Sequence, residues 1–307
     1  MSSALDIKPG GWRTTFASYY ELTKPNVVLT MVFTAWVGML LAKPGTFPFN
    51  AFIFGTLGIA LMSGAAAAVN HVVDRYVDAK MYRTKNRPLP SGNLSPANCF
   101  TFAFLIGLVG LLILLFFVNT LTAVLTTLSL IGYAFIYSLW LKRATPQNIV
   151  IGGLAGASPP LLGWTAVTNQ IDAYALVLVL IIFVWTPPHF WALAIYRKED
   201  YAKAGIPMLP VTHGNDFTRL QIIFYTVLLL LVSLLPFLVG GNGVMYMIGA
   251  LFLGGVFLYH ALMMWYTKSD AWATKTFVYS IVYLLLLFTF LLIDRYLPLL
   301  LARIPAV

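Results

Sequence analysis

Long apolar blocks are the feature that most restricts the fold of this 307-residue chain. A helix that crosses a bilayer needs about 20 consecutive, mostly apolar residues. The chain is 60% hydrophobic and only 9% charged, whereas soluble domains are about half apolar and about a quarter charged. Blocks of this kind lie near 26–42, 51–73, 98–118, 121–141, 147–167, 172–194, 219–239, 243–266 and 274–297. The sequence therefore predicts an integral membrane protein.

The predicted fold class is an all-α bundle of about nine transmembrane helices. A transmembrane barrel would instead require alternating strands of about 10 residues each. We expect one transmembrane domain over residues 26–300, preceded by an N-terminal segment of residues 1–25.

The basic residues predict the orientation of the bundle. A nine-span arrangement places Lys43, Arg295 and Arg303 on one side and the remaining sixteen of the 19 lysines and arginines on the other. Because basic residues concentrate in cytoplasmic loops, the N-terminus and the charged loops are predicted to be cytoplasmic. The bases flank spans and form no separate basic domain, so we expect no nucleic-acid partner.

Two further features bear on the compartment. The first residues, MSSALDIKPGGWRTTF, lack the apolar core of a signal peptide, and we expect a bacterial-type cytoplasmic (inner) membrane. The single cysteine, Cys99, excludes an internal disulfide and a cysteine-based metal cluster.

One charged segment, NHVVDRYVDAKMYRTKNRPLPSG at residues 70–92, stands out in this apolar chain. Asn70, Asp74 and Asp78 follow one another at intervals of four residues. If the second span continues as a helix to about residue 80, they drift only about 80° around its axis. Two carboxylates and an amide oxygen on one line favour a divalent cation, and Mg²⁺ completes its coordination with substrate phosphates. The sequence therefore predicts a Mg²⁺ site at the edge of the membrane.

Basic residues follow this acidic line directly, at Arg83, Lys85 and Arg87. Guanidinium groups bind phosphate oxygens in bidentate fashion, so acids, Mg²⁺ and bases together indicate a diphosphate site. The alternative is that the bases only determine topology and pair with the acids.

A second set of candidates surrounds the end of the sixth span, WTPPHFWALAIYRKED. Pro187 and Pro188 are expected to break or kink that helix. His189 lies among aromatic residues. It is a candidate ligand or acid–base catalyst, and the alternative is that it only packs against its neighbours. Asp200 is a candidate to supply a further carboxylate opposite the first two, or an ordinary loop residue.

Small and aromatic residues suggest a buried ligand. The small residues let helices or a flat ligand approach closely, although packing alone also explains them. The aromatic residues are candidates to line a cavity, or to belong to the membrane belt and the core. The small residues are Gly152, Gly153, Ala155, Gly156 and Ala157, and the aromatic ones are Tyr133, Tyr137, Trp140, Trp164, Trp185, Phe190 and Trp191.

The acidic line followed by RTKNRP resembles the first aspartate-rich motif of the intramembrane aromatic prenyltransferases. The blocks LKRATPQNIVIGG, AGASPPLLGW, WTPPHFWALA and DYAKAGIPMLPV are similar to the branch of that family that farnesylates haem. The resemblance implies nine helices around a central cavity open to the cytoplasmic side and to lipid. It also implies the reaction of farnesyl diphosphate with haem B and water, which gives diphosphate and haem O. The haem O would serve terminal oxidases.

The resemblance also implies roles for individual residues. Asn70, Asp74 and Asp78 hold Mg²⁺ and diphosphate, and Arg83, Lys85 and Arg87 bind phosphate oxygens. The chain departs from the family in its second aspartate motif, because Ala204 follows Asp200 at the fourth position and the earlier aspartate falls near Arg197. It therefore stays open whether Asp200 helps to hold a second Mg²⁺ ion, or whether Arg197 and Lys198 neutralise phosphate instead.

His189 and His71 are the candidates for haem-iron ligation or for positioning the water. Haem A synthase and a terminal oxidase assembly are candidate partners. The alternatives are prenyl transfer to a quinone precursor or a chlorin, an ion-coupled transporter, and an assembly factor that only holds haem.

Overall fold

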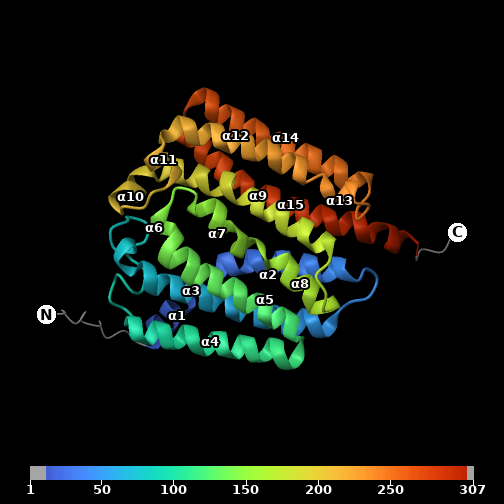
Figure 1. Cartoon of the computed structure of the whole chain (residues 1–307), viewed down its shortest axis with the longest axis horizontal. Coiled ribbons are helices and arrows are strands. Elements are labelled where there is room, and N and C mark those ends of the chain that lie inside the picture. Colours follow the sequence, from blue (N-terminus) through green and yellow to red (C-terminus); the bar gives the residue numbers. More distant parts are fainter. Residues whose placement is uncertain (1–11, 303–307) are drawn as a thin grey trace.

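The computed structural model describes residues 12–302, and these form helices and no strand (Figure 1). Nine stretches of the described chain are long and apolar enough to cross a membrane. They are α2 (Pro25–Ala42), η1 with α3 (Ala51–Gly55, Thr56–Asp78), α4 (Pro96–Phe117), α5 with η2 and α6 (Thr120–Ile131, Gly132–Leu141, Lys142–Ala144), α7 with α8 (Asn148–Ala157, Pro159–Thr168), α9 (Ala173–Tyr196), α12 with α13 (Gly214–Val232, Leu235–Leu238), α14 (Val244–Thr267) and α15 (Asp270–Leu301). Each corresponds to one predicted block, so the prediction of an all-helical, multi-pass membrane protein is confirmed.

Three short helices lie outside the spans: α1 (Trp12–Leu22), α10 (Lys198–Lys203) and α11 (Leu209–Thr212). Residues 1–11 of the predicted N-terminal segment, Lys8 among them, lie outside the described residues, as does Arg303. The cytoplasmic location of that segment stays a prediction.

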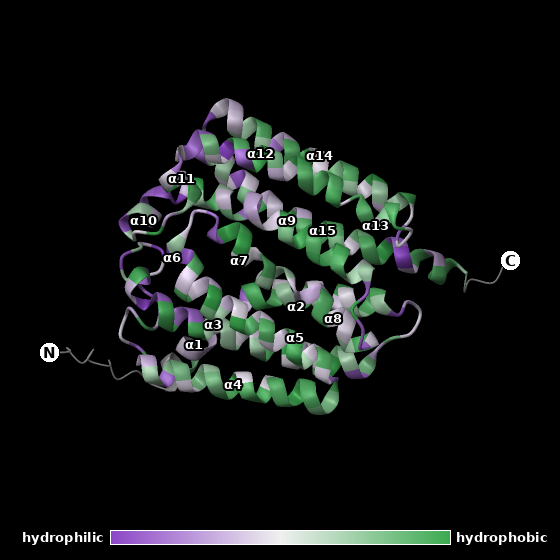
Figure 2. Ribbon diagram, viewed as in Figure 1, coloured by the Kyte–Doolittle hydropathy of each residue, from purple (hydrophilic) through white to green (hydrophobic). Residues whose placement is uncertain are grey.

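Hydrophilic residues gather at one end of the bundle, around α6, α10 and α11, and we call this the polar end (Figure 2). The loops 79–95 and 197–213 both lie there (Figure 1). The sides of the bundle expose large apolar side chains, among them Phe104, Phe116 and Phe252. Such a surface suits lipid contact, because hydrocarbon solvates apolar side chains and cannot solvate exposed backbone.

Local sequence explains several helix boundaries. Helix α4 begins after Ser95, whose hydroxyl accepts a hydrogen bond from the backbone N–H of Asn98, with Pro96 at the first helical position. Helix α5 begins after Asn119 in the same way, with the N–H of Thr122 as donor. Helix α3 continues to Asp78, so the acidic line predicted from the sequence lies on one helix.

Of the break or kink expected at Pro187 and Pro188, the break is absent, because α9 is continuous from Ala173 to Tyr196. Helices α12 and α15 pack against α9. The fifth span breaks instead, between α7 and α8 at Ser158 and Pro159. Pro159 has no N–H for the carbonyl of Ala155, and this carbonyl accepts hydrogen bonds from the hydroxyls of Ser129 (3.0 Å) and Ser158 (2.9 Å).

Helices α2 and α8 approach so closely that their backbones touch at two glycines. A Cβ atom on Gly38 would lie 2.1 Å from the carbonyl oxygen of Pro160, and one on Gly163 would lie 2.0 Å from that of Ala35. Main-chain atoms of a packed helix cannot move aside as a side chain can. These glycines therefore fix the separation of the two helices.

We predict that Gly163→Ala lowers the stability of the folded protein by at least about 2 kcal/mol, because overpacking against backbone forces the helices apart. The matched control is Gly255→Ala on α14, where a Cβ atom meets nothing within 4 Å. Thermal unfolding in detergent measures both. Equal melting temperatures for the two variants would contradict the close contact.

Candidate active site at the polar end

The acidic stripe, which we define as Asn70, Asp74 and Asp78, is buried on α3. The three residues are only 4%, 1% and 3% exposed, respectively. Asn70 donates from Nδ2 to Asp74 Oδ2 at 2.8 Å and to Ser138 Oγ at 3.0 Å, which links α3 to η2. The helical alignment expected from the sequence is therefore present, and burial makes each of these polar groups dependent on a partner.

Two lysines from other spans supply partners for the stripe. Lys24, at the start of α2, donates from Nζ to Asn70 Oδ1 at 2.6 Å. Lys142, at the end of η2, donates from Nζ to Asp74 Oδ2 at 2.5 Å. Both lysines entered the sequence analysis only as topology signals. Their shared feature in the sequence is that each begins or ends a span at the same end of the bundle.

The third partner comes from loop 79–95. Arg87 pairs with Asp78 through Nη1 and Oδ2 at 2.7 Å. The buried Thr84 hydroxyl donates to the carbonyl oxygen of Asp78 at 2.9 Å and holds the loop on the end of α3. Arg83 and Lys85, predicted to share the site, are exposed, and the Nζ of Lys85 lies 4.7 Å from the ring centroid of Tyr82. Of these three bases, Arg87 is the one with an ion pair to the stripe.

The cluster is electropositive despite its two carboxylates. Burial lowers the pKa of Lys24 to about 7, and the positive charges of Arg87 and Lys142 act in the same direction. Asp74 and Asp78 partly offset this effect. A pKa near 7 leaves Lys24 partly protonated at neutral pH, and an arriving anion would favour its charged form.

One oxygen of the stripe fits a cation. Asp74 Oδ1 is buried and has no hydrogen-bond partner in the described structure. A buried carboxylate oxygen without a partner is costly, and its presence points to an ion or water. Within residues 12–302 no group of three or more His, Cys, Asp or Glu side chains is placed to hold a metal. Mg²⁺ would therefore rest on one or two carboxylates and on phosphate oxygens, as this ion often does.

Loop 197–213 packs on loop 79–95. Met81 belongs to the same buried cluster as Ile195 and Met208, which brings the two charged loops together. Arg197 lies 3.9 Å from Asp200, so the nearest charged partner of Asp200 is on its own helix turn. Lys198 is half-buried beside them. The metal role of Asp200, and the phosphate roles of Arg197 and Lys198, stay predictions.

Tyr201 marks where the two loops meet, and the sequence analysis missed it. Burial raises the pKa of Tyr201, while the charges of Arg83, Arg197 and Arg87 act in the opposite direction. A neutral phenol beside these three guanidinium groups adds a hydroxyl donor to the basic surface.

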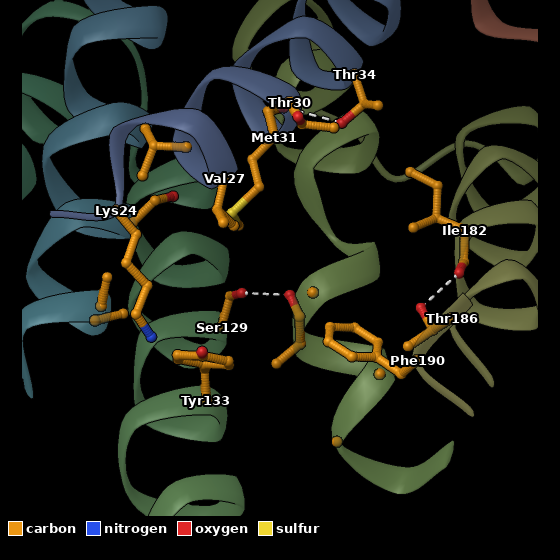
Figure 3. A pocket seen from close by; sticks show the side chains of 18 of the residues that line it. Lys24, Val27, Thr30, Met31, Thr34, Ser129, Tyr133, Ile182, Thr186 and Phe190 are labelled. Atoms are coloured by element: carbon orange, nitrogen blue, oxygen red, sulfur yellow. Dashed lines mark hydrogen bonds between the residues drawn. The ribbon is translucent and has the colours of Figure 1, made fainter. Parts of the chain in front are cut away.

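A cavity of about 590 Å³ extends from this cluster into the apolar bundle (Figure 3). Lys24 and Tyr133 lie on one side of it, and Thr186 and Phe190 lie on the other (Figure 3). Tyr133 and Tyr137 also line the cavity, and both lie on η2, a π-helical segment of the kind that often occurs at functional sites. The cavity thus meets the polar cluster at Lys24, and the rest of its lining is mostly apolar and aromatic.

The structure separates the predicted lining residues into two groups. Tyr133, Tyr137, Trp185, Phe190, Gly152, Gly153, Ala155 and Gly156 line the cavity. Ala157 and Trp164 belong to the core, and Trp191 is buried against Tyr225. Trp140 is 66% exposed on the surface of the bundle.

The two histidine candidates differ in position. His189 is on the cavity wall, and its Nδ1 lies 2.6 Å from the Oγ of Ser280. His71 is buried on α3 beside the stripe but is not among the residues that line the cavity. Neither ring nitrogen of His71 has a hydrogen-bond partner in the described structure. The geometry therefore favours His189 for contact with a ligand in the cavity.

Comparison with known proteins places this site in a family. Residues 31–300 match the model of the UbiA prenyltransferase family. The chain is 59% identical over 286 residues to the protoheme IX farnesyltransferase of Teredinibacter turnerae. This match covers 93% of this chain and 91% of that protein. It also resembles a solved digeranylgeranylglyceryl phosphate synthase, with a TM-score of 0.76 and 18% identity over 92% of this chain and 99% of the other.

A UbiA homologue from Archaeoglobus fulgidus, solved with DMAPP and Mg²⁺ bound, has the same fold, with a TM-score of 0.61. It is 15% identical, and the match covers 89% of this chain and 99% of that one. The fold, the buried acidic stripe and the family match agree. This chain belongs to the UbiA prenyltransferase family.

Proposed function

We propose that this protein transfers the farnesyl group of farnesyl diphosphate to a vinyl group of haem B with addition of water, giving haem O and diphosphate. The observation that carries the proposal is a cavity lined by apolar and aromatic side chains and by Lys24, whose ammonium group binds Asn70 of the acidic stripe. The choice of haem as acceptor rests on the extensive identity with relatives named protoheme IX farnesyltransferase.

The polar cluster is suited to bind the diphosphate. Lys24, Lys142 and Arg87 meet on the acidic stripe and can turn to phosphate oxygens, because each is held there by one short contact. Mg²⁺, held by Asp74 and Asp78, would supply the remaining neutralisation of the leaving diphosphate. Stabilising the charge that develops on the leaving group is the main contribution of such a site.

Loss of diphosphate leaves an allylic farnesyl cation, which the cavity must protect from early reaction with water. Its lining is apolar and aromatic, and Tyr133 and Tyr137 lie next to the cluster, where faces of aromatic rings stabilise positive charge. The haem vinyl group then attacks the cation, and a late water quenches the resulting carbocation. His189 stands on the opposite wall as the candidate that contacts haem.

The cellular setting follows from charge. We place the polar end on the cytoplasmic side of a bacterial-type inner membrane, because the basic loops gather there. Residues 26–300 would act as one transmembrane domain, and haem O would pass to haem A synthase or to a terminal oxidase assembly.

The direct test is incubation of the purified protein with Mg²⁺, haem B and isotopically labelled farnesyl diphosphate, followed by mass spectrometry of the haem. We expect haem to gain the mass of one farnesyl group plus one water. Transfer to a quinone precursor or a chlorin instead of haem would overturn it.

Removing the stripe carboxylates should greatly lower the activity. We predict that Asp74→Asn and Asp78→Asn each lower kcat/KM by at least about 100-fold, because leaving-group stabilisation is lost. EDTA should do the same to the unaltered protein, with recovery on addition of Mg²⁺. The control is Asp216→Asn, whose carboxylate is exposed and pairs with Lys268 at the same end. Equal activity of all three variants would exclude the stripe.

Lys24 should contribute mainly to diphosphate binding. We predict that Lys24→Met raises the KM for farnesyl diphosphate by about 10- to 100-fold, since a hydrogen bond to a charged group is worth about 1.5–3 kcal/mol. Lys268→Met is the matched control, because this lysine is 62% exposed and lies outside the cavity. Steady-state kinetics with haem at saturation measures both, and an unchanged KM in Lys24→Met would remove this lysine from the site.

A further inference from the structure

The imidazole of His189 is held rigidly in the wall of the cavity. The ring of Trp185 stacks on it with centroids 4.3 Å apart and planes at 18°, and the ring of Phe277 stacks on it at 4.7 Å and 27°. Two near-parallel rings this close must occupy opposite faces of the imidazole. Its edge is therefore the part of His189 that remains for contact with a ligand.

The hydroxyl of Ser280 determines which nitrogen carries the proton. Ser280 Oγ lies 2.6 Å from His189 Nδ1 and 2.5 Å from the carbonyl oxygen of Phe277. A carbonyl oxygen only accepts, so the single proton of the hydroxyl must point to Phe277. We therefore assign the imidazole proton to Nδ1, which donates to Ser280 Oγ and leaves Nε2 as an unprotonated acceptor.

Ser280 itself is fixed in place. It is fully buried on α15, and its carbonyl oxygen accepts a hydrogen bond from the indole N–H of Trp185 at 2.7 Å. The same tryptophan thus stacks on His189 and is tied to the residue that orients it. Neutral imidazole with Nδ1–H bound and Nε2 free is the arrangement that most metal-ligating histidines have.

We infer that Ser280 is a positioning residue that presents His189 Nε2 as an axial ligand to the iron of the haem substrate. The inference rests on the proposed function, and it adds the atom that binds haem and the residue that prepares it. His71 is not assigned as the haem ligand, because it is not among the residues that line the cavity.

The test is a titration of the purified protein with ferric haem B, followed by its Soret band and by electron paramagnetic resonance. We expect a nitrogen-ligated spectrum in the unaltered protein and its loss in His189→Ala. Ser280→Ala should weaken haem binding by about 10- to 100-fold and alter the spectrum, because partners of a ligating histidine typically contribute that much. Ser280→Thr, which keeps the hydroxyl, should restore both.

The matched control is Ser233→Ala, which also removes a buried hydroxyl with a partner, the phenol of Tyr283 at 2.7 Å, but away from the cavity. It should leave the haem spectrum and affinity unchanged. If Ser280→Thr is unstable, added imidazole provides an independent readout, because it should restore the nitrogen-ligated spectrum to His189→Ala.

Two results would overturn the inference. One is an unchanged spectrum and affinity in Ser280→Ala, and the other is a nitrogen-ligated spectrum that persists in His189→Ala. Either leaves the proposed function standing if haem is still farnesylated. An unaltered protein that neither binds nor farnesylates haem would overturn both.

Discussion

The structure depends on how it compensates two carboxylates buried in a chain with few charges. Asp74 and Asp78 are almost fully buried, and an uncompensated buried charge is among the most destabilising features a protein can have. Lys142 and Arg87 pair with them, and Lys24 binds the neighbouring Asn70. These contacts join the start of α2, the end of η2 and loop 79–95 to one face of α3. The bundle is thereby arranged around its candidate site.

This arrangement also gives the diphosphate and the flat acceptor separate parts of the site. Lys24 and the stripe that it binds offer charge for a diphosphate, and the wall formed by α9 and α15 offers a stacked, oriented imidazole for a flat aromatic ligand. Such a division suits a reaction that separates charge at one place and forms a carbon–carbon bond at another. These cations lie beside the stripe, and once they have turned to the phosphate oxygens, little further reorganisation is needed when the leaving group departs.

Local patterns made much of this predictable from the sequence. The nine spans follow from apolar length, and the stripe follows from intervals of four residues on one helix. The partners of the stripe were not predictable in this way, because Lys24 and Asn70 are 46 residues apart and Lys142 and Asp74 are 68 apart. Such pairing depends on how helices pack, which no local pattern encodes.

Prolines and tryptophans also show that local sequence does not determine how helices pack. Pro187 and Pro188 leave α9 continuous, whereas Pro159 coincides with a real break that two serine hydroxyls support. Both pairs look alike in the sequence, and the packing around them decides the outcome. Trp185 lines the cavity while Trp191, six residues later, is buried elsewhere, because a helix turns its residues to different neighbours.

The most direct measurement of the central claim is an experimental structure of the protein with Mn²⁺ in place of Mg²⁺ and an unreactive thio analogue of farnesyl diphosphate. We expect metal density at Asp74 Oδ1, with Lys24 and Lys142 turned from the stripe to phosphate oxygens. Metal density away from α3, with both lysines still on Asn70 and Asp74, would contradict it.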